Sequence, residues 1–184
     1  MTALPPPPHP EGPPVPGRVL GVDPGSTATG WAVLERQRGR YLLVAHGVIR
    51  TSSDDPIPQR LCRIHAGLQA VLSEHRPALA AIEIIFQHRS SESALRLGQA
   101  RGVALLALGQ AGLDVGEYNP MTVKKSVAGH GGAGKPEVQR VVQRLLGLPQ
   151  PLAADAADAV AIAITHLAVG AFAAHAARPP GAPA

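Results

Sequence analysis

The sequence has very few cysteines and aromatic residues. Its 184 residues include one cysteine, Cys62, and only 3% aromatic side chains, against 45% hydrophobic residues. One cysteine excludes an internal disulfide framework and is typical of a reducing cytoplasm, where we expect the protein to lie. Cys62 follows a helical pattern with no base beside it, which favours inert packing over a nucleophilic role. The core must therefore be built from Ala, Val, Leu and Ile.

Long uninterrupted apolar runs are also missing. Charges or glycine interrupt each apolar stretch before about 18 residues, except the last, which carries two aspartates. Residues 1–17 contain eight prolines and no apolar segment of the signal-peptide kind. We expect a soluble protein without a membrane partner, with a disordered proline-rich leader over 1–17, one domain over 18–175 and a disordered tail over 176–184.

The charge balance is moderately basic. Seventeen Lys and Arg face thirteen Asp and Glu, which gives a net charge of +4. This excess favours nucleic acid or another anionic surface as the partner, although the signal is weak by itself.

Hydrophobic periodicity and turn signals predict five strands and five helices. Three strands in a meander, followed by strands that alternate with helices, indicate an α/β fold with one mixed sheet flanked by helices. The predicted strands are 18–22, 30–37, 40–50, 79–85 and 114–119, and the predicted helices are 58–75, 91–111, 120–128, 136–146 and 153–174.

The stretch from Arg18 to Arg36 holds the first candidate site residue. Asp23 directly follows the apolar run 19–22, at the point where a buried strand first meets solvent. The alternative is that Asp23 only begins the Asp-Pro-Gly turn, because Asp and Pro both favour turns for local reasons.

Three further acids occur in apolar surroundings. Glu83 is the only polar residue of the run 79–85, where its charge is costly to bury unless it is compensated. Asp155 and Asp158 are three residues apart in an apolar helical pattern, which places them on one face, about 60° apart. The alternative for Asp155 is that it only stabilises its helix, by its favourable interaction with the helix dipole near the amino end.

Four converging carboxylates predict divalent cations. Carboxylates repel one another unless they are protonated or bridged, and hard ions with oxygen ligands are the usual solution. Two Mg²⁺ ions about 3.5–4 Å apart can share these acids, activate water and stabilise the leaving 3′ oxygen of a phosphodiester. The spacing permits this geometry without proving it.

Basic residues bracket the glycine-rich loop 129–134. Backbone amides of the loop, together with Lys124, Lys125 and Lys135, can take a phosphate oxygen, whereas the alternative is solvated surface lysines. His130 in the loop can contact phosphate, or is simply solvated. Pro136 replaces the Ser or Thr that a nucleotide-binding loop of this pattern needs, which argues against nucleotide binding.

Taken together, these segments resemble the RuvC-type Holliday-junction resolvases. The likeness runs from about Arg18 to His166 through VLGVDPGSTATGWAV, AAIEIIFQ, SALRLGQARGVALLAL, MTVKKSVAGHGGAGK and AADAADAVAIAITH. It implies a ribonuclease-H-like fold and a homodimer. The activity implied is a Mg²⁺- or Mn²⁺-dependent endodeoxyribonuclease that makes paired incisions across a four-way junction in recombination and repair. A branch-migration motor complex is a further implied partner.

The resemblance also assigns roles to residues. Asp23, Glu83, Asp155 and Asp158 match the metal-binding acids of the family, and Lys124 and Lys135 match basic residues near the substrate. Phe86 becomes a candidate for stacking on an unpaired base, with a core anchor as the alternative, and Arg89 a candidate phosphate contact. Ile84 departs from the family, which often has a polar residue there.

Three questions stay open from the sequence. Gly98 and Gly102 form a small-residue face that suits either a dimer contact or packing on the sheet. The chain can also be a relative that binds branched nucleic acid without cutting it, or a nuclease of the same fold that acts on RNA–DNA hybrids.

Overall fold

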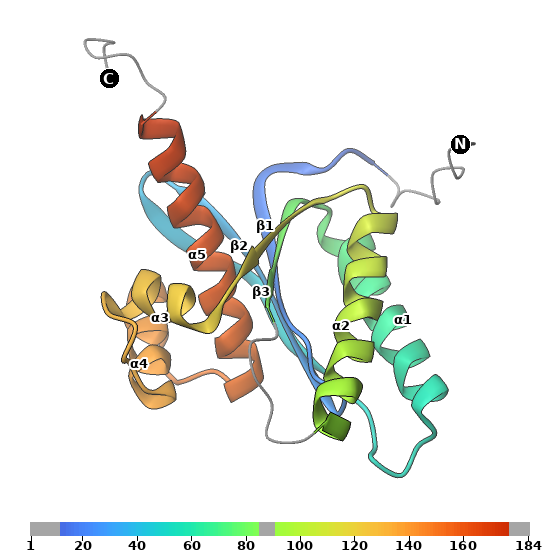
Figure 1. The fold of residues 1–184 in the computed structure, drawn as a ribbon. Coiled ribbons are helices and arrows are strands. Elements are labelled where there is room, and N and C mark those ends of the chain that lie inside the picture. The colour runs from blue at the N-terminus through green and yellow to red at the C-terminus, as the bar shows by residue number, and fades with distance from the viewer. Residues whose placement is uncertain (1–11, 85–90, 177–184) are drawn as a thin grey trace.

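The computed structural model describes residues 12–84 and 91–176, and its centre is a five-stranded mixed sheet (Figure 1). The strand order is β3-β2-β1-β4-β5, with β1–β2 and β2–β3 antiparallel and β1–β4 and β4–β5 parallel. This confirms the predicted meander followed by parallel strands. The strands are β1 (Val15–Asp23), β2 (Ala28–Gln37), β3 (Arg40–Arg50), β4 (Pro77–Glu83) and β5 (Asp114–Tyr118).

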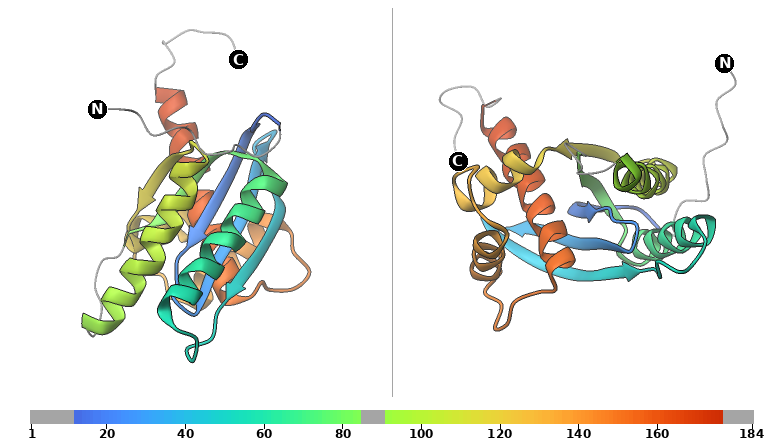
Figure 2. Two further views of the ribbon diagram at one scale, coloured as in Figure 1. Left: turned by 90° about the vertical axis from the view of Figure 1, so that its right-hand side faces the viewer. Right: turned by 60° about the horizontal axis from the view of Figure 1, so that its bottom comes forward.

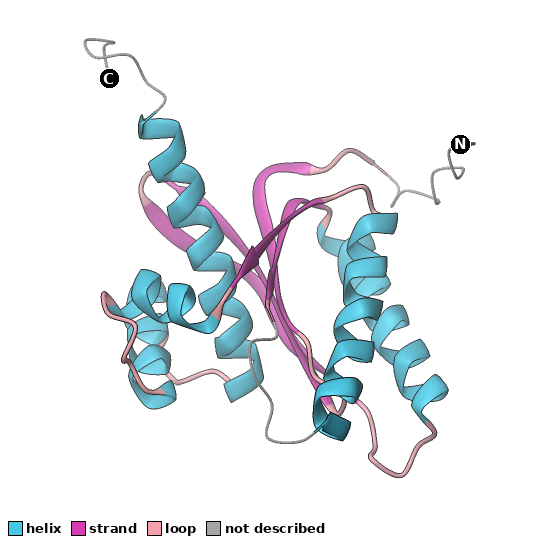
Figure 3. Cartoon of the chain, in the orientation of Figure 1, coloured by secondary structure: helices cyan, strands magenta, loops and turns pink. Residues whose placement is uncertain are grey.

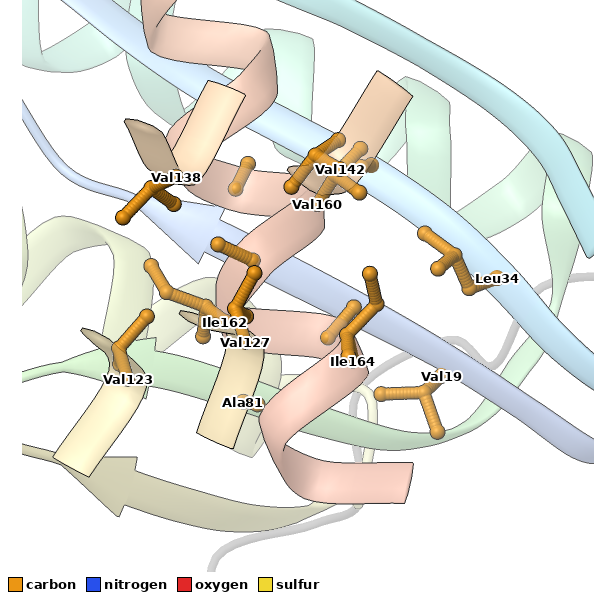
Figure 4. Close-up of a cluster of buried hydrophobic side chains, with 14 of the residues drawn as sticks. Val19, Leu34, Ala81, Val123, Val127, Val138, Val142, Val160, Ile162 and Ile164 are labelled. Atoms are coloured by element: carbon orange, nitrogen blue, oxygen red, sulfur yellow. The ribbon is translucent and has the colours of Figure 1, made fainter. Parts of the chain in front are cut away.

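Helices cover both faces of the sheet (Figures 2 and 3). One face is covered by α1 (Ile57–His75) and α2 (Ser91–Gln110). The other is covered by α5 (Ala154–Ala176), against which α3 (Pro120–Ala128) and α4 (Lys135–Leu146) pack. Each face has its own apolar core, and the core under α5 is built almost entirely from Ala, Val, Leu and Ile (Figure 4).

Two glycines allow α5 to lie directly on the sheet. A Cβ atom added at Gly30 of β2 would overlap the carbonyl oxygen of Asp155, and one added at Gly21 of β1 would overlap that of Ala159. The backbone of α5 therefore rests on the backbones of β1 and β2 without side chains between them. This contact fixes the first turns of α5 against the end of β1.

The structure differs from the sequence expectations in a few places. β1 begins at Val15, three residues earlier than predicted, because the Val15 amide donates a hydrogen bond to the Arg76 carbonyl (2.8 Å). β4 ends at Glu83, two residues earlier than predicted. The prediction of a packing role for Cys62 was wrong, because this side chain is exposed on α1. Within the described ranges, no helix combines the length and apolar character needed to cross a membrane.

Candidate active site

Asp23 and Glu83 lie side by side at one edge of the sheet. They are the last residues of the neighbouring parallel strands β1 and β4, and the register pairs Val22 with Ile82 just before them. Side chains alternate between the faces of a strand. Since Val22 and Ile82 belong to the core under α1 and α2, both carboxylates lie on the opposite face, beneath α5.

Asp158 joins these two acids from the second turn of α5. The three carboxylate residues line one cavity of about 290 Å³, together with Lys124 of α3 and Lys135 of α4. Asp155 does not line this cavity, but its charge contributes to the pKa of Asp23. The structure thus brings three of the four predicted acids into one cavity and places the fourth nearby.

The carboxylates crowd negative charge into a partly buried space. The pKa of Asp23 is raised to about 7, chiefly by burial and also by the charges of Glu83, Asp158 and Asp155, against the opposing effect of Lys135. Burial and Asp158 also raise the pKa of Glu83, while Lys135 and Lys124 lower it. Such crowding is unfavourable without a cation.

Lys135 pairs directly with one of these acids. Its Nζ donates a hydrogen bond to Asp158 Oδ2 at 2.9 Å. This bond and the charges of Asp158, Asp23 and Glu83 raise the pKa of the lysine. Lys135 is also the first residue of α4, where a cation is unfavourable for the helix dipole. Its position is therefore explained by the acids and not by the stability of α4.

The donor set fits a hard divalent cation by its chemistry, because it offers carboxylate oxygens alone. In the part of the chain that the structure describes, no three Asp, Glu, His or Cys side chains are grouped closely enough to hold a metal ion as they stand. Lys135 and Lys124 are the cations that line the cavity with the acids, and the Lys135 ammonium is hydrogen-bonded to Asp158. A shared ion would require the carboxylates to close around it, so the four-ligand set stays a prediction.

The other predicted site residues are distributed unevenly. Lys124 lines the acidic cavity, whereas Lys125 is exposed on α3 and lines no cavity described above. His130 is exposed and pairs with Glu137 (Nε2 to Oε1, 3.1 Å) instead of with the acids. Phe86 and Arg89 lie outside the described residues.

Sequence reasoning missed two arginines that bind the backbone near the acids. The Arg60 side chain is buried, and its Nε and Nη2 donate to the Ser26 carbonyl in the turn after Asp23 (3.1 and 2.6 Å). Arg101 of α2 donates to the carbonyl of Glu83 itself (Nε to O, 3.0 Å). The one available signal was that Arg60 precedes Ile64 by four residues and so lies on the apolar stripe of its helix.

Comparison with known proteins identifies the family. The family model described as crossover junction endodeoxyribonuclease RuvC matches residues 19–166. The chain belongs to the RuvC family. It is 49% identical over 150 residues to RuvC of Chloroflexus aggregans, a match that covers 81% of this chain and 92% of the relative. It is 47% identical over 151 residues to RuvC of Bradyrhizobium diazoefficiens, with 82% and 86% covered.

Solved RuvC structures share this fold. Thermus thermophilus RuvC in complex with a Holliday junction substrate matches with a TM-score of 0.80 and 39% identity, covering 85% of this chain and 96% of that chain. The yeast mitochondrial Holliday junction resolvase Ydc2 matches with a TM-score of 0.64 at 15% identity, covering 90% and 83%, and so shows the fold alone. The predicted family, ribonuclease-H-like fold and class of enzyme, a crossover junction endodeoxyribonuclease, are therefore confirmed. RuvC enzymes are metal-dependent nucleases.

Proposed function

We propose that this RuvC protein resolves four-way DNA junctions by paired, Mg²⁺-dependent phosphodiester hydrolysis during recombination and repair. The observation that supports the proposal most is the cavity in which Asp23, Glu83 and Asp158 meet Lys124 and Lys135. Carboxylates for cations and lysines for phosphates are the two components that hydrolysis of a DNA backbone requires.

Asp23, Glu83, Asp155 and Asp158 would hold two Mg²⁺ ions, or Mn²⁺ in their place. The ions would supply Lewis-acid activation of water and stabilisation of the departing 3′ oxygen. Lys124 on α3 and Lys135 on α4, which both line the cavity, would then bind the phosphates that flank the scissile bond. Lys125 on α3 and His130 in the loop after it, both exposed, would contact phosphates further along the strand. Phe86 and Arg89 keep their predicted roles in base stacking and phosphate binding.

A homodimer is supported by the outer face of α2. Leu95 and Leu106 on this helix are exposed by 63% and 54%. Gly98 and Gly102 are exposed between them, and an added Cβ at either position would meet nothing within 4 Å. These glycines therefore do not serve packing on the sheet, and the face suits close approach of a second α2. A two-fold dimer places two sites on opposed strands, so that both can be cut together.

Dimerisation can be tested separately from catalysis. Gly102→Glu would place a charge at the centre of the α2 face, and we expect a monomer in sedimentation experiments. Leu145→Glu on α4 changes an exposed apolar residue elsewhere and should leave the dimer intact. A parental association state for Gly102→Glu would exclude this face as the interface.

The decisive experiment is cleavage of a synthetic four-way junction with strand-by-strand mapping of the cuts. We expect symmetric incisions in Mg²⁺ and none with chelator, leaving nicks suited to ligation. Asp23→Asn should abolish cleavage but keep junction affinity, because backbone contacts supply most of the affinity. Asp54→Asn, in an exposed loop, is the matched control.

The same experiment separates the alternatives. A protein that binds junctions but never cuts them with metal would be the non-cleaving relative. Preferential cutting of a linear RNA–DNA hybrid of equal length would indicate the hybrid-directed nuclease. A partnership with a branch-migration motor would appear as stimulated cleavage when junctions are moved past the enzyme.

A further inference from the structure

Arg101 contacts the backbone of a proposed metal ligand from the far side of the sheet. Its Nε donates to the Glu83 carbonyl oxygen at 3.0 Å, and its Nη2 pairs with the Glu117 carboxylate on β5. The Arg101 side chain is only 17% exposed, whereas that of Glu117 is 48% exposed. The guanidinium thus spans from helix α2 to the ends of two strands.

This contact completes the hydrogen bonding of a single peptide group. The amide of Ile84, on the other side of the Glu83–Ile84 peptide bond, donates to the Tyr118 carbonyl at 2.8 Å. Both polar groups of this peptide unit are therefore bonded, one to β5 and one to Arg101. The peptide plane at the end of β4 cannot rotate without breaking one of these bonds.

The fixed peptide matters because Glu83 is the last residue of its strand. Among the described residues, the bond from the Ile84 amide to Tyr118 is the last one that joins this segment to a neighbouring strand. The carboxylate lies under α5, whereas the carbonyl of the same residue is bound from the α2 side.

We propose that Arg101 is a positioning residue that holds the Glu83 carboxylate in line with Asp23 and Asp158. The planar guanidinium suits this task because Nε and Nη2 donate from fixed positions to two different acceptors. A lysine would have to reach both acceptors from a single nitrogen that lies one bond further along the side chain than Nε. The inference rests on the proposed function, in which Glu83 is a metal ligand.

Metal binding without DNA gives a readout that is independent of turnover. Arg101→Met keeps the aliphatic stem but removes the donors, and we expect Mn²⁺ affinity in calorimetry to fall about ten-fold, as with other partners that orient ligands. The Mn²⁺ concentration for half-maximal junction cleavage should rise by the same factor. Junction affinity in chelator should stay within about two-fold, because no phosphate contact is lost.

Two further variants keep the test decisive. Glu117→Gln removes the charge of the partner but leaves the bond from Arg101 to the Glu83 carbonyl, so its metal affinity should stay close to the parental value. Arg101→Lys keeps the charge and should show a smaller loss than Arg101→Met. If Arg101→Met does not fold, as judged by circular dichroism, Arg101→Lys decides, and parental metal affinity there would overturn the proposal.

Failure of this proposal can be told apart from failure of the proposed function. Parental metal binding by a folded Arg101→Met, or an equal loss in Glu117→Gln, would refute positioning through the carbonyl bond. A parental protein that neither binds Mn²⁺ nor cuts junctions would instead refute the metal-dependent nuclease itself.

Discussion

Replacement of Asp23 with Asn should make the metal-free protein more stable at neutral pH. The pKa of Asp23 is raised from 3.8 to about 7 in the folded protein, chiefly by burial and by Glu83 and Asp158. The folded state binds this proton more tightly than the unfolded chain does. The contribution of protonated Asp23 to the free energy of unfolding is therefore fully present below about pH 4 and is lost as the pH rises to about 7.

The magnitude follows from the size of the shift. The difference between 3.8 and about 7 is roughly three pH units, and each unit corresponds to about 1.4 kcal/mol. Ionised Asp23 therefore lowers the free energy of unfolding by about 4 kcal/mol above pH 7. Asparagine has a similar size and cannot ionise, so the free energy of unfolding of the variant should not fall in this way as the pH rises. A gain of this size corresponds to a melting temperature higher by about 10 °C in a domain of this length.

Urea unfolding in the presence of chelator, from pH 4 to pH 8, measures the effect. The stabilities of the parent and Asp23→Asn should be similar at pH 4 and should diverge by about 4 kcal/mol at pH 8. Asp54→Asn removes an exposed carboxyl and should follow the parental profile. Parallel profiles for the parent and Asp23→Asn would refute the reasoning, because the acid would then be neither desolvated nor crowded. Added Mg²⁺ should restore stability to the parent but not to the variant.

Two other substitutions test the surroundings of the acids. Lys135→Met removes the ammonium that pairs with Asp158. Mg²⁺ should then bind several-fold more tightly in the absence of DNA, while the rate of cleavage should fall. An unchanged Mg²⁺ affinity in calorimetry would show that the ion pair does not compete with the metal. Gly30→Ala forces a methyl group against the backbone of α5 and should lower the free energy of unfolding in urea by about 3 kcal/mol. Gly98 has open space around it, so Gly98→Ala should not lower the free energy of unfolding of a protomer. Equal stability of these two glycine variants would mean that α5 can retreat from the sheet.

The fold was largely predictable because its signals are local. Helix α3 matches the predicted range 120–128, since Asn119 caps it and Gly129 ends it in a left-handed conformation. The early start of β1 was missed because Pro16 and Gly17 are typical of a proline-rich leader. The bond that begins the strand joins Val15 to Arg76, a distant residue in the sequence.

The site was predictable only in part for a related reason. An acid beside or within an apolar run marked Asp23 and Glu83 as candidates, but the predicted strand 79–85 placed Glu83 inside its strand. That the two acids end neighbouring parallel strands is a finding of the structure. The pairing of Lys135 with Asp158 depends on how α4 packs against α5, which no local pattern specifies. Arg60 and Arg101 act through backbone carbonyls, and because every residue has one, the sequence carries no sign of the partner.

The contact of α5 with Gly21 and Gly30 has a consequence for how the acids move. Side chains normally pack between a helix and a sheet, and a change of their rotamers can shift the helix by a fraction of an ångström. Here main chain touches main chain, so the offset between Asp23 and Asp158 is set by peptide dimensions that no repacking alters. β1 and α5, which are far apart in the sequence, thus behave as one rigid unit that carries Asp23 and Asp158.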